Sequence, residues 1–357
     1  MKILVVGDEF ISSKLLKKHL NDQLKPTVKD LEYDEIDFGP TDITTMMYED
    51  IDEYWGDAEL LIEKIVACEI LLVIDAPVTR EVIETGKNLR VIGCARGGPV
   101  NVNVKEATRR GIPVLNSPGR NATAVADFTI GLMLALMRKI TKAEQFLRNG
   151  RWKRNKQDTF EKPSGPELWG KKVGIMGFGQ VGRKVARRLV GFDVQILVHD
   201  PYVPENIIES MGCTPANLSK LLSESDVVSL HLRLPHKKAG WFDLEKLKLM
   251  KKTAYLINTS RGYVVDEGDL VKALEEKVIR GAALDVFEKE PINIKGRLLE
   301  LDNVVLTPHV AGISNEVPGR SCKIVAQQIT KYISGERPEH IVNPEILGKN
   351  PFRLNGK

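Results

Sequence analysis

A glycine-rich turn between a strand pattern and a helix pattern is the strongest constraint on how this chain folds. The apolar run 173–176 leads into the turn, and an amphipathic pattern over 183–189 follows it. In such a unit the glycines permit a tight turn, a close approach of phosphate to the backbone, and close packing of helix on strand. We predict that the turn binds the pyrophosphate of a dinucleotide through Gly177, Phe178, Gly179, Gln180, Val181 and Gly182.

An acidic residue closes the next strand pattern. The run 194–198 is followed by Asp200, at close to the roughly 20-residue spacing expected for the acid that binds the ribose hydroxyls. A carboxylate at this position repels a 2′-phosphate, and the following Pro201 and Tyr202 supply no compensating positive charge. The sequence therefore predicts NAD rather than NADP as the cofactor.

Short β-branched runs alternate with amphipathic stretches along the whole chain, which favours an α/β protein with parallel sheets. A first series of predicted strands covers 3–6, 70–74, 91–94 and 112–115. A second series covers 173–176, 194–198, 227–230, 254–257, 282–286 and 304–306, and fits one doubly wound sheet. The apolar stretch 121–140 between the two series predicts one long buried helix joining two domains, and the polar stretch 149–170 predicts a loop.

Three chemically active side chains follow three of the later strands. Arg261, Glu290 and His309 come after the runs 254–257, 282–286 and 304–306. Because the carboxyl ends of parallel strands meet at one edge of a sheet, we expect these side chains there together. A guanidinium can hold a carboxylate with two bonds, an imidazole can transfer the proton of a hydroxyl, and a carboxylate can orient the imidazole. The sequence therefore predicts a hydride-transfer site.

Several segments together resemble the D-isomer-specific 2-hydroxyacid dehydrogenases, and the similarity runs from about residue 70 to 315. The resemblance implies that Arg261 binds the carboxylate and carbonyl of the substrate and that His309 is the acid/base. It also implies that Glu290 pairs with His309, because the family motif places the catalytic carboxylate directly before the proline, here Pro291, rather than at Glu288. The segments are 111–119, 167–171, 177–182, 258–262, 285–291 and 307–312.

The same resemblance implies further contacts with the cofactor. Asp285 is expected to contact the nicotinamide amide, and the loop 231–235 is expected to lie along the adenine. The resemblance also implies a homodimer formed through the cofactor domains. The remaining residues predicted to bind the cofactor are His231, Leu232, Pro235, Thr259, Ser260 and Gly312.

The strand pattern and the resemblance together predict two doubly wound parallel-sheet domains. A Rossmann domain for NAD, residues 119–313, is expected to be inserted into a flavodoxin-like substrate domain. The substrate domain is expected to consist of residues 1–118 and 314–357, because the pattern becomes helical again over 319–334 and the chain returns to its first domain.

The substrate loop departs from the family pattern. Relatives usually read G-x-G-x-D-N, whereas residues 96–101 of this chain read RGGPVN. Gly97 and Gly98 keep backbone N–H groups available for a substrate carboxylate, but Arg96 replaces a glycine. Two interpretations of Arg96 stay open: it contacts a second polar or anionic group of the substrate, or it forms an ion pair within its own domain.

Composition narrows the remaining function classes. The net charge is only +4, with 52 basic and 48 acidic residues, so we expect no nucleic-acid partner. No apolar stretch approaches the length of a membrane span, and the start lacks the hydrophobic segment of a signal peptide. The cysteines lack the paired spacing of a metal site, so we expect no metal, reduced buried thiols and a cytoplasmic location. The four cysteines are Cys68, Cys94, Cys213 and Cys322.

We predict NAD-dependent hydride transfer at C2 of a D-2-hydroxy acid or 2-keto acid. Two alternatives remain: an NAD-sensing corepressor-like binding protein on the same fold, and a 3-phosphoglycerate dehydrogenase. Asp75, in the loop 74–79, opposes a phosphate group by charge repulsion, whereas Arg80 and Arg96 would favour it. A different dehydrogenase class on this fold would not require the order Arg–Glu–His.

Overall fold

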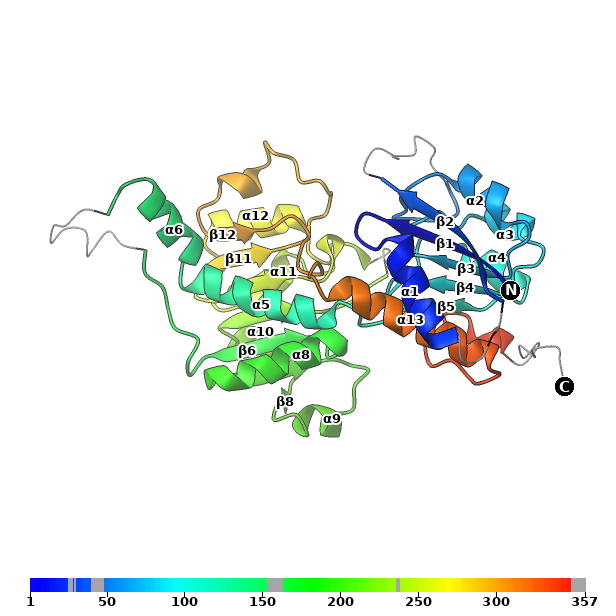
Figure 1. Cartoon of the computed structure of the whole chain (residues 1–357). Helices are drawn as coiled ribbons and strands as arrows, with labels where there is room; N and C mark the ends of the chain where they lie inside the picture. Colours follow the sequence, from blue (N-terminus) through cyan, green and yellow to red (C-terminus); the bar gives the residue numbers. More distant parts are fainter. Residues whose placement is uncertain (25–27, 29, 40–47, 153–162, 236–237, 348–357) are drawn as a thin grey trace. The chain divides into compact units, whose positions relative to one another are not determined.

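The computed structural model describes residues 1–24, 28, 30–39, 48–152, 163–235 and 238–347. The chain divides into two compact units. Unit 1 comprises Met1–Asn121 and Ser314–Lys357, and unit 2 comprises Ala122–Ile313. Each unit is built around its own parallel sheet with helices packed on it (Figure 1).

The sheet of unit 1 has five parallel strands in the order β2-β1-β3-β4-β5. The strand order reverses beside β1, because β2 lies on one side of it and β3 on the other. This is the flavodoxin-like order that we predicted. The edge strand β2 was missed in the sequence, because its residues EYDEIDF are mostly charged and only Phe38 is buried. The strands are β1 Lys2–Asp8, β2 Glu32–Phe38, β3 Ile70–Val73, β4 Val91–Cys94 and β5 Val114–Leu115.

Two apolar layers form the core of unit 1, one on each face of the sheet. Alternate residues of β1 serve the two layers: Ile3 and Val5 pack with α1 and α13, while Leu4 and Val6 pack with α2 and α3. The C-terminal helix α13 packs against α1, so the end of the chain completes the unit (Figure 1). The helices are α1 Ser13–Leu24, α2 Ala58–Ile65, α3 Arg80–Thr85, α4 Val104–Arg109, α13 Val317–Ile333 and the 3-10 turn η5 Pro344–Ile346.

The sheet of unit 2 has seven parallel strands in the order β12-β11-β10-β9-β6-β7-β8. The order reverses beside β6, which lies between β7 and β9, as in a Rossmann fold. All six predicted strands are present, and the short edge strand β8 was missed. The strands are β6 Lys172–Met176, β7 Gln195–His199, β8 Thr214–Pro215, β9 Val227–Leu230, β10 Tyr255–Asn258, β11 Gly281–Leu284 and β12 Val304–Leu306.

Helices cover both faces of the unit 2 sheet. On one face α5 packs against α8 and against β10, β11 and β12; on the other, α11 packs against α10 and α12. The helices are α5 Ala122–Met137, α6 Ile140–Arg148, α8 Gln180–Leu189, α9 Glu205–Glu209, α10 Leu218–Glu224, α11 Leu244–Leu249 and α12 Glu267–Glu275. Described residues of this unit also form the 3-10 turns η1 Val190–Phe192, η3 Gly262–Val264 and η4 Arg297–Glu300.

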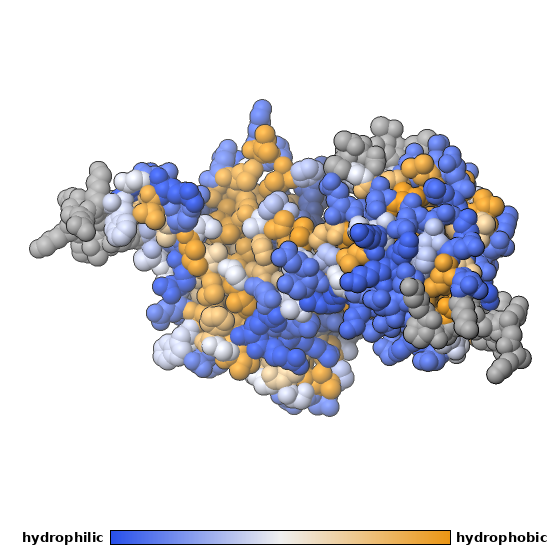
Figure 2. Space-filling model, in the orientation of Figure 1, coloured by the Kyte–Doolittle hydropathy of each residue, from blue (hydrophilic) through white to orange (hydrophobic). Residues whose placement is uncertain are grey.

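The single long helix predicted over 121–140 is wrong in its extent. Helix α5 ends at Met137, and the left-handed backbone of Lys139 (φ 53°) separates it from α6. Helix α6 has no buried residue and leaves Ile140 and Leu147 about half exposed. Figure 2 shows apolar residues at the surface of this part of unit 2. The described parts of the predicted loop, 149–152 and 163–170, contain no helix or strand, and 153–162 lie outside the described residues.

The predicted fold class is confirmed, because both units are doubly wound parallel-sheet α/β structures. All four cysteines are buried and free. Within the part of the chain that the structure describes, no helix combines the length and the apolar character needed to cross a membrane.

The side chain of Asn343 ties the returning chain to unit 1. Its Oδ1 accepts from the Val114 amide (2.9 Å), and its Nδ2 donates to the Ile112 carbonyl (2.9 Å). Asn343→Ala should lower the free energy of unfolding by about 2 kcal/mol, because it leaves buried backbone groups without partners. Urea denaturation measures the change, with the exposed Glu345→Ala as a matched control that should shift stability by less than about 0.5 kcal/mol. Equal stability of the two variants would contradict this role.

Candidate active site

The glycine-rich turn follows β6, where the strand order of unit 2 reverses. Gly177 has a φ of +90°, and a Cβ there would lie 2.6 Å from the carbonyl oxygen of His231. A Cβ on Gly182 would lie 2.2 Å from the carbonyl oxygen of Gly177, so both positions require glycine. Gly179 is the N-cap residue of α8. Apart from Gly179 itself, the adjacent residues of the chain and the helix backbone, no described atom lies within 4 Å of its Cβ position. This open position next to free helix N–H groups fits the pyrophosphate of a dinucleotide.

Asp200 stands directly after β7, beside this turn. Its Oδ2 accepts from the Phe178 amide (2.7 Å), and its Oδ1 accepts from the Tyr202 amide (2.9 Å). The two bonds fix the carboxylate, which stays partly exposed. A fixed, accessible carboxylate next to the glycine-rich turn fits the ribose hydroxyls of the cofactor.

His231 follows β9 on the other side of the turn. Its Nε2 lies 2.9 Å from the Ser229 hydroxyl, and its Nδ1 is buried without a partner among the described residues. Burial lowers the pKa of His231 to about 4, so the ring is neutral near pH 7. Leu232 and Pro235 continue the same loop, which the Tyr263 hydroxyl holds by donating to the Leu234 carbonyl (2.8 Å). The predicted adenine loop therefore lies next to the predicted pyrophosphate turn.

His309 and Glu290 are in hydrogen-bond contact at the carboxyl edge of the sheet. His309 Nδ1 and Glu290 Oε2 are 2.6 Å apart, and Glu290 Oε1 accepts from the Phe287 amide (3.0 Å). The side chains are 48% and 35% exposed, so the pair is open to a substrate. No described residue forms a hydrogen bond with His309 Nε2.

Asp285 holds the loop that carries His309. Its Oδ1 accepts from the Thr307 hydroxyl (2.6 Å) and the Val310 amide (3.0 Å), and its Oδ2 accepts from the Ala311 amide (2.8 Å). His309 itself has the left-handed φ of 52°, which a side chain other than glycine adopts only when its surroundings enforce it. The buried carboxylate of Asp285 supplies that enforcement. The predicted Gly312 lies in the turn that follows.

Arg261 follows β10 on an exposed loop, and its Nη1 donates to the Ser260 carbonyl (2.8 Å). The buried Asn258 fixes this loop: its Nδ2 donates to the Arg261 carbonyl (3.0 Å), and its Oδ1 accepts from the Ser260 amide and hydroxyl. Sequence reasoning missed this role of Asn258, although asparagine directly after a strand is a common turn-forming residue. Thr259 contacts the Thr129 hydroxyl at 2.8 Å.

The loops of Arg261 and Glu290 touch each other. A Cβ on Gly262 would lie 1.8 Å from the Phe287 carbonyl oxygen, so only glycine fits between the two loops. The fold thus places Arg261, Glu290 and His309 after the neighbouring strands β10, β11 and β12, as the sequence predicted. Among the described residues, no group of three or more His, Cys, Asp or Glu side chains is arranged to hold a metal ion.

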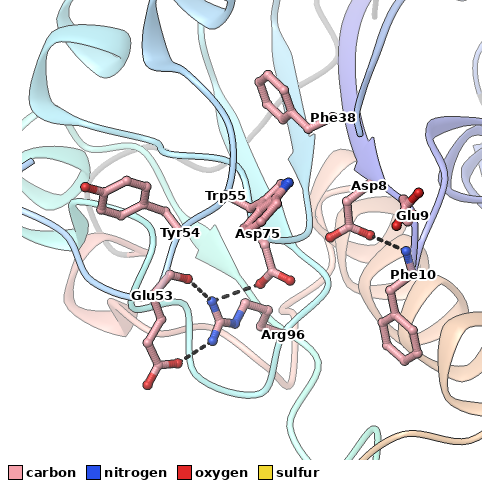
Figure 3. Close-up of a pocket in the computed structure, with 9 residues that line it drawn as sticks. All are labelled: Asp8, Glu9, Phe10, Phe38, Glu53, Tyr54, Trp55, Asp75 and Arg96. Carbon is pink, nitrogen blue, oxygen red and sulfur yellow. Dashed lines mark hydrogen bonds and ion pairs between the residues drawn. The ribbon is translucent and has the colours of Figure 1, made fainter. Parts of the chain in front are cut away.

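Arg96 lies in unit 1 and forms ion pairs within that unit (Figure 3). Its Nη2 lies 2.5 Å from Glu53 Oε2, and its Nη1 lies 2.9 Å from Asp75 Oδ1. The second of the two interpretations of Arg96 therefore describes this structure. The neighbouring Gly97 and Gly98 are partly exposed, and the Asn116 side chain donates to the Gly97 carbonyl (2.8 Å).

Comparison with known proteins places these features in one family. Residues 130–311 match the model for the NAD binding domain of D-isomer specific 2-hydroxyacid dehydrogenases. A glyoxylate reductase of Korarchaeum cryptofilum is 40% identical over 301 residues, which cover 84% of this chain and 90% of the relative. A D-3-phosphoglycerate dehydrogenase of Methanocaldococcus jannaschii is 40% identical over 304 residues, which cover 83% of this chain and 57% of the relative.

The fold is also similar to solved structures. An NADPH-dependent glyoxylate/hydroxypyruvate reductase from Sinorhizobium meliloti, in complex with NADP and malonate, superposes with a TM-score of 0.71. The two sequences are 28% identical, and the match covers 100% of this chain and 99% of that chain. A Pyrococcus horikoshii protein, PH0520, is 31% identical with a TM-score of 0.73, and the match covers 98% and 97% of the two chains.

The contacts of Asp285 generate a testable prediction. Asp285→Asn keeps the shape of the side chain but turns one acceptor into an NH2 donor, which opposes the Thr307, Val310 or Ala311 donors. We expect it to lower the free energy of unfolding by about 1–3 kcal/mol and to reduce kcat because the His309 loop loses its anchor. The fully exposed Asp302→Asn is the matched control in urea denaturation and turnover assays. Wild-type kcat and stability in Asp285→Asn would show that this carboxylate does not organise the loop.

Proposed function

Because the chain belongs to the D-isomer-specific 2-hydroxyacid dehydrogenase family, we propose that Arg261, Glu290 and His309 form its catalytic set. The enzyme is a D-2-hydroxyacid dehydrogenase that uses a nicotinamide cofactor. The 2.6 Å contact between His309 Nδ1 and Glu290 Oε2 is the observation that carries the proposal, since it orients the imidazole and leaves Nε2 for the substrate.

The cofactor supplies or accepts the hydride when it is bound. During reduction of a 2-keto acid, protonated His309 donates its Nε2 proton to the carbonyl oxygen; during oxidation the neutral ring takes the hydroxyl proton. Glu290 orients the imidazole through its contact with Nδ1. The guanidinium of Arg261 holds the substrate carboxylate through two parallel bonds.

The cofactor contacts that we propose extend along the carboxyl edge of the unit 2 sheet. The turn 177–182 and the N-terminus of α8 would bind the pyrophosphate. Asp200 would bind the ribose. The loop that contains His231, Leu232 and Pro235 would lie along the adenine. Asp285 would contact the nicotinamide amide, and Thr259, Ser260 and Gly312 would add further contacts with the cofactor. The open position at Gly179 and the orphaned Nδ1 of His231 support this assignment.

We propose a small 2-keto acid without a phosphate, such as glyoxylate, as a substrate. The arginines that would favour phosphohydroxypyruvate are already paired: Arg80 with Glu84 at 2.9 Å, and Arg96 with Glu53 and Asp75. Similarity to glyoxylate reductases supports the same choice. The 3-phosphoglycerate reaction remains the second candidate because a relative with that name is equally similar.

We also propose a homodimer formed through unit 2 and a cytoplasmic location. Helix α6 supports the dimer, because it has no buried residue and exposes Ile140 (52%) and Leu147 (55%). A second copy would cover these apolar side chains. The four buried, free thiols support a reducing compartment.

Substitutions at the two acids near Pro291 test the catalytic set. Glu290→Gln keeps the shape but removes the charge, so kcat/KM for glyoxylate reduction should fall at least roughly tenfold; His309→Asn should cost roughly a hundredfold or more. The exposed Glu288→Gln is the matched control and should keep wild-type activity. NADH binding, followed by fluorescence, should survive in all three variants because the glycine-rich turn is untouched. Loss of activity in Glu288→Gln but not in Glu290→Gln would assign the role to the other carboxylate.

Asp200 should make NADH the better cofactor. We expect kcat/KM at least roughly tenfold higher with NADH than with NADPH, because the fixed carboxylate repels a 2′-phosphate. Asp200→Asn should narrow that ratio, since Asn retains an acceptor for the Phe178 amide but has no charge. The exposed Glu205→Gln, on α9, is the control and should leave the ratio unchanged. A several-fold preference of the wild-type enzyme for NADPH would contradict the assignment.

A further inference from the structure

Unit 2 contains a cavity of about 230 Å³ at the amino edge of its sheet, the edge opposite to the catalytic set. It lies between the junction of α5 with α6 and the first residues of β10 and β12, Tyr255 and Val304 (Figure 1). All residues that line it belong to unit 2. The cavity is therefore separate from both the catalytic set and the glycine-rich turn.

Tyr255 brings an unpartnered polar atom to this cavity. The residue is only 5% exposed, and its ring packs in the apolar core beneath α5. The hydroxyl forms no hydrogen bond with a described residue, yet it is not among the unpartnered atoms that are sealed from solvent. Because the side chain lines the cavity, the hydroxyl opens into it. Burial raises the pKa of Tyr255, although Arg280 offsets part of the effect, so the hydroxyl stays protonated and can donate to a ligand.

Three basic side chains and one acidic side chain line the cavity. Arg280 forms no ion pair with a described residue, and its Cζ lies 5.8 Å from the centre of the Tyr255 ring. Lys139 also has no acidic partner among the described residues. Lys142 Nζ lies 3.3 Å from the carboxylate of Asp302, whose side chain is fully exposed. The lining side chains thus carry two more positive charges than negative ones.

Acidic side chains outside the lining leave this positive charge in place. Glu167 and Glu276 form no ion pair with a described residue, and both are exposed, so solvent and salt screen their charges. Exposed basic residues of the same region, Arg138, Lys252 and Lys277, have the opposite charge. The remaining acids near this edge are already bonded to basic side chains: Glu144 to Arg148, Glu224 to Lys172, Asp226 to Lys251, and Glu275 and Glu300 to Arg297.

The first turn of α6 borders the same cavity. Lys139 is the N-cap residue of this helix, no side chain caps it, and Lys142 lies in its first turn. The backbone N–H groups of a first turn have no partner within the helix, and together they attract anions. At the adjoining end of α5, the carbonyls of Leu134 and Leu136 already accept from the two amides that follow that helix.

We propose that this cavity binds a phosphate group. The Tyr255 hydroxyl, the Arg280 guanidinium, the two ammonium groups and the first turn of α6 are all hydrogen-bond donors, and a phosphate dianion matches the two excess positive charges. A carboxylate has fewer oxygens and one charge, so it would satisfy fewer of these donors. An apolar ligand would leave the Tyr255 hydroxyl without a partner. The site does not depend on the proposed catalytic set, because it lies at the other edge of the sheet.

Isothermal titration calorimetry with inorganic phosphate tests the proposal at a pH where phosphate is mainly a dianion. Saturating NADH occupies the glycine-rich turn, and sodium chloride keeps the ionic strength constant. We expect saturable phosphate binding, and a midpoint of thermal unfolding that rises with phosphate concentration. Acetate should bind at least roughly tenfold more weakly, because it has one charge and two oxygens. Absence of phosphate binding, or equal binding of acetate, would overturn the proposal.

Substitutions distinguish this cavity from any other anion site of the protein. Tyr255→Phe removes the hydroxyl alone and should weaken phosphate binding roughly threefold to tenfold, whereas Arg280→Gln should weaken it roughly tenfold or more. The exposed Lys220→Gln, on α10 at the opposite face of the sheet, is the matched control and should keep the wild-type affinity. Circular dichroism shows which variants are folded. Wild-type phosphate affinity in either folded cavity variant, or an equal loss in Lys220→Gln, would overturn the assignment.

Glycerol 3-phosphate separates two sources of the phosphate group. Equal or tighter binding than that of inorganic phosphate would identify the site as one for a phosphorylated small molecule. Binding at least roughly tenfold weaker would identify it as a site for the free ion. In both cases Arg280→Gln should weaken the binding, and a ligand whose binding is insensitive to this substitution does not occupy the cavity.

Discussion

In each unit all strands run parallel, so every carboxyl end lies on the same edge of its sheet. The residue that follows each strand therefore lies at that edge, however far apart these residues are in the sequence. The fold can therefore assemble a site from segments far apart in the chain. In unit 2 the residues that lie at this edge are Gly177 after β6, Asp200 after β7, His231 after β9, Arg261 after β10, Asp285 after β11 and His309 after β12.

The edge alone does not fix the orientation of His309. Its left-handed backbone costs on the order of 1–3 kcal/mol for a residue other than glycine. Three hydrogen bonds to the charged Asp285, each worth about 1.5–3 kcal/mol, outweigh that cost and hold the loop. Glu290 then fixes the ring through Nδ1 while its other oxygen is held by the Phe287 amide. The Asp285 carboxylate thus holds the backbone of the loop, and the Glu290 carboxylate orients the imidazole.

The elements that depend on a short sequence pattern, such as the buried strands and the glycine-rich turn, could be predicted from the sequence. The central strands are apolar runs because both faces are buried, and the glycine-rich turn is a short motif with a fixed spacing of glycines. Edge strand β2 could not be predicted, because its charged residues face solvent on an edge where few side chains need to be apolar. The break between α5 and α6 occurs at Lys139. Lysine is not a residue type that usually ends a helix, so only the structure reveals the break.

The ion pairs of Arg96 could not be predicted for a different reason. Glu53, Asp75 and Arg96 come from three separate segments without a recognisable motif, and tertiary packing alone brings them together. Arg96 illustrates the limit: the sequence left its partner open, because both an ion pair and a substrate anion satisfy a guanidinium. The structure resolves that choice through Glu53 and Asp75.

The central claim is that the His309–Glu290 pair performs proton transfer in an active dehydrogenase. The alternative is a protein that contains the same pair but only binds NADH. NADH oxidation by the wild-type protein, followed in the presence of glyoxylate, hydroxypyruvate, pyruvate, 2-oxoglutarate or phosphohydroxypyruvate, tests this most directly. We expect turnover with at least glyoxylate or hydroxypyruvate, and D-configured product wherever the product is chiral. Tight NADH binding without oxidation by any of these acids would contradict it and favour a cofactor-sensing protein.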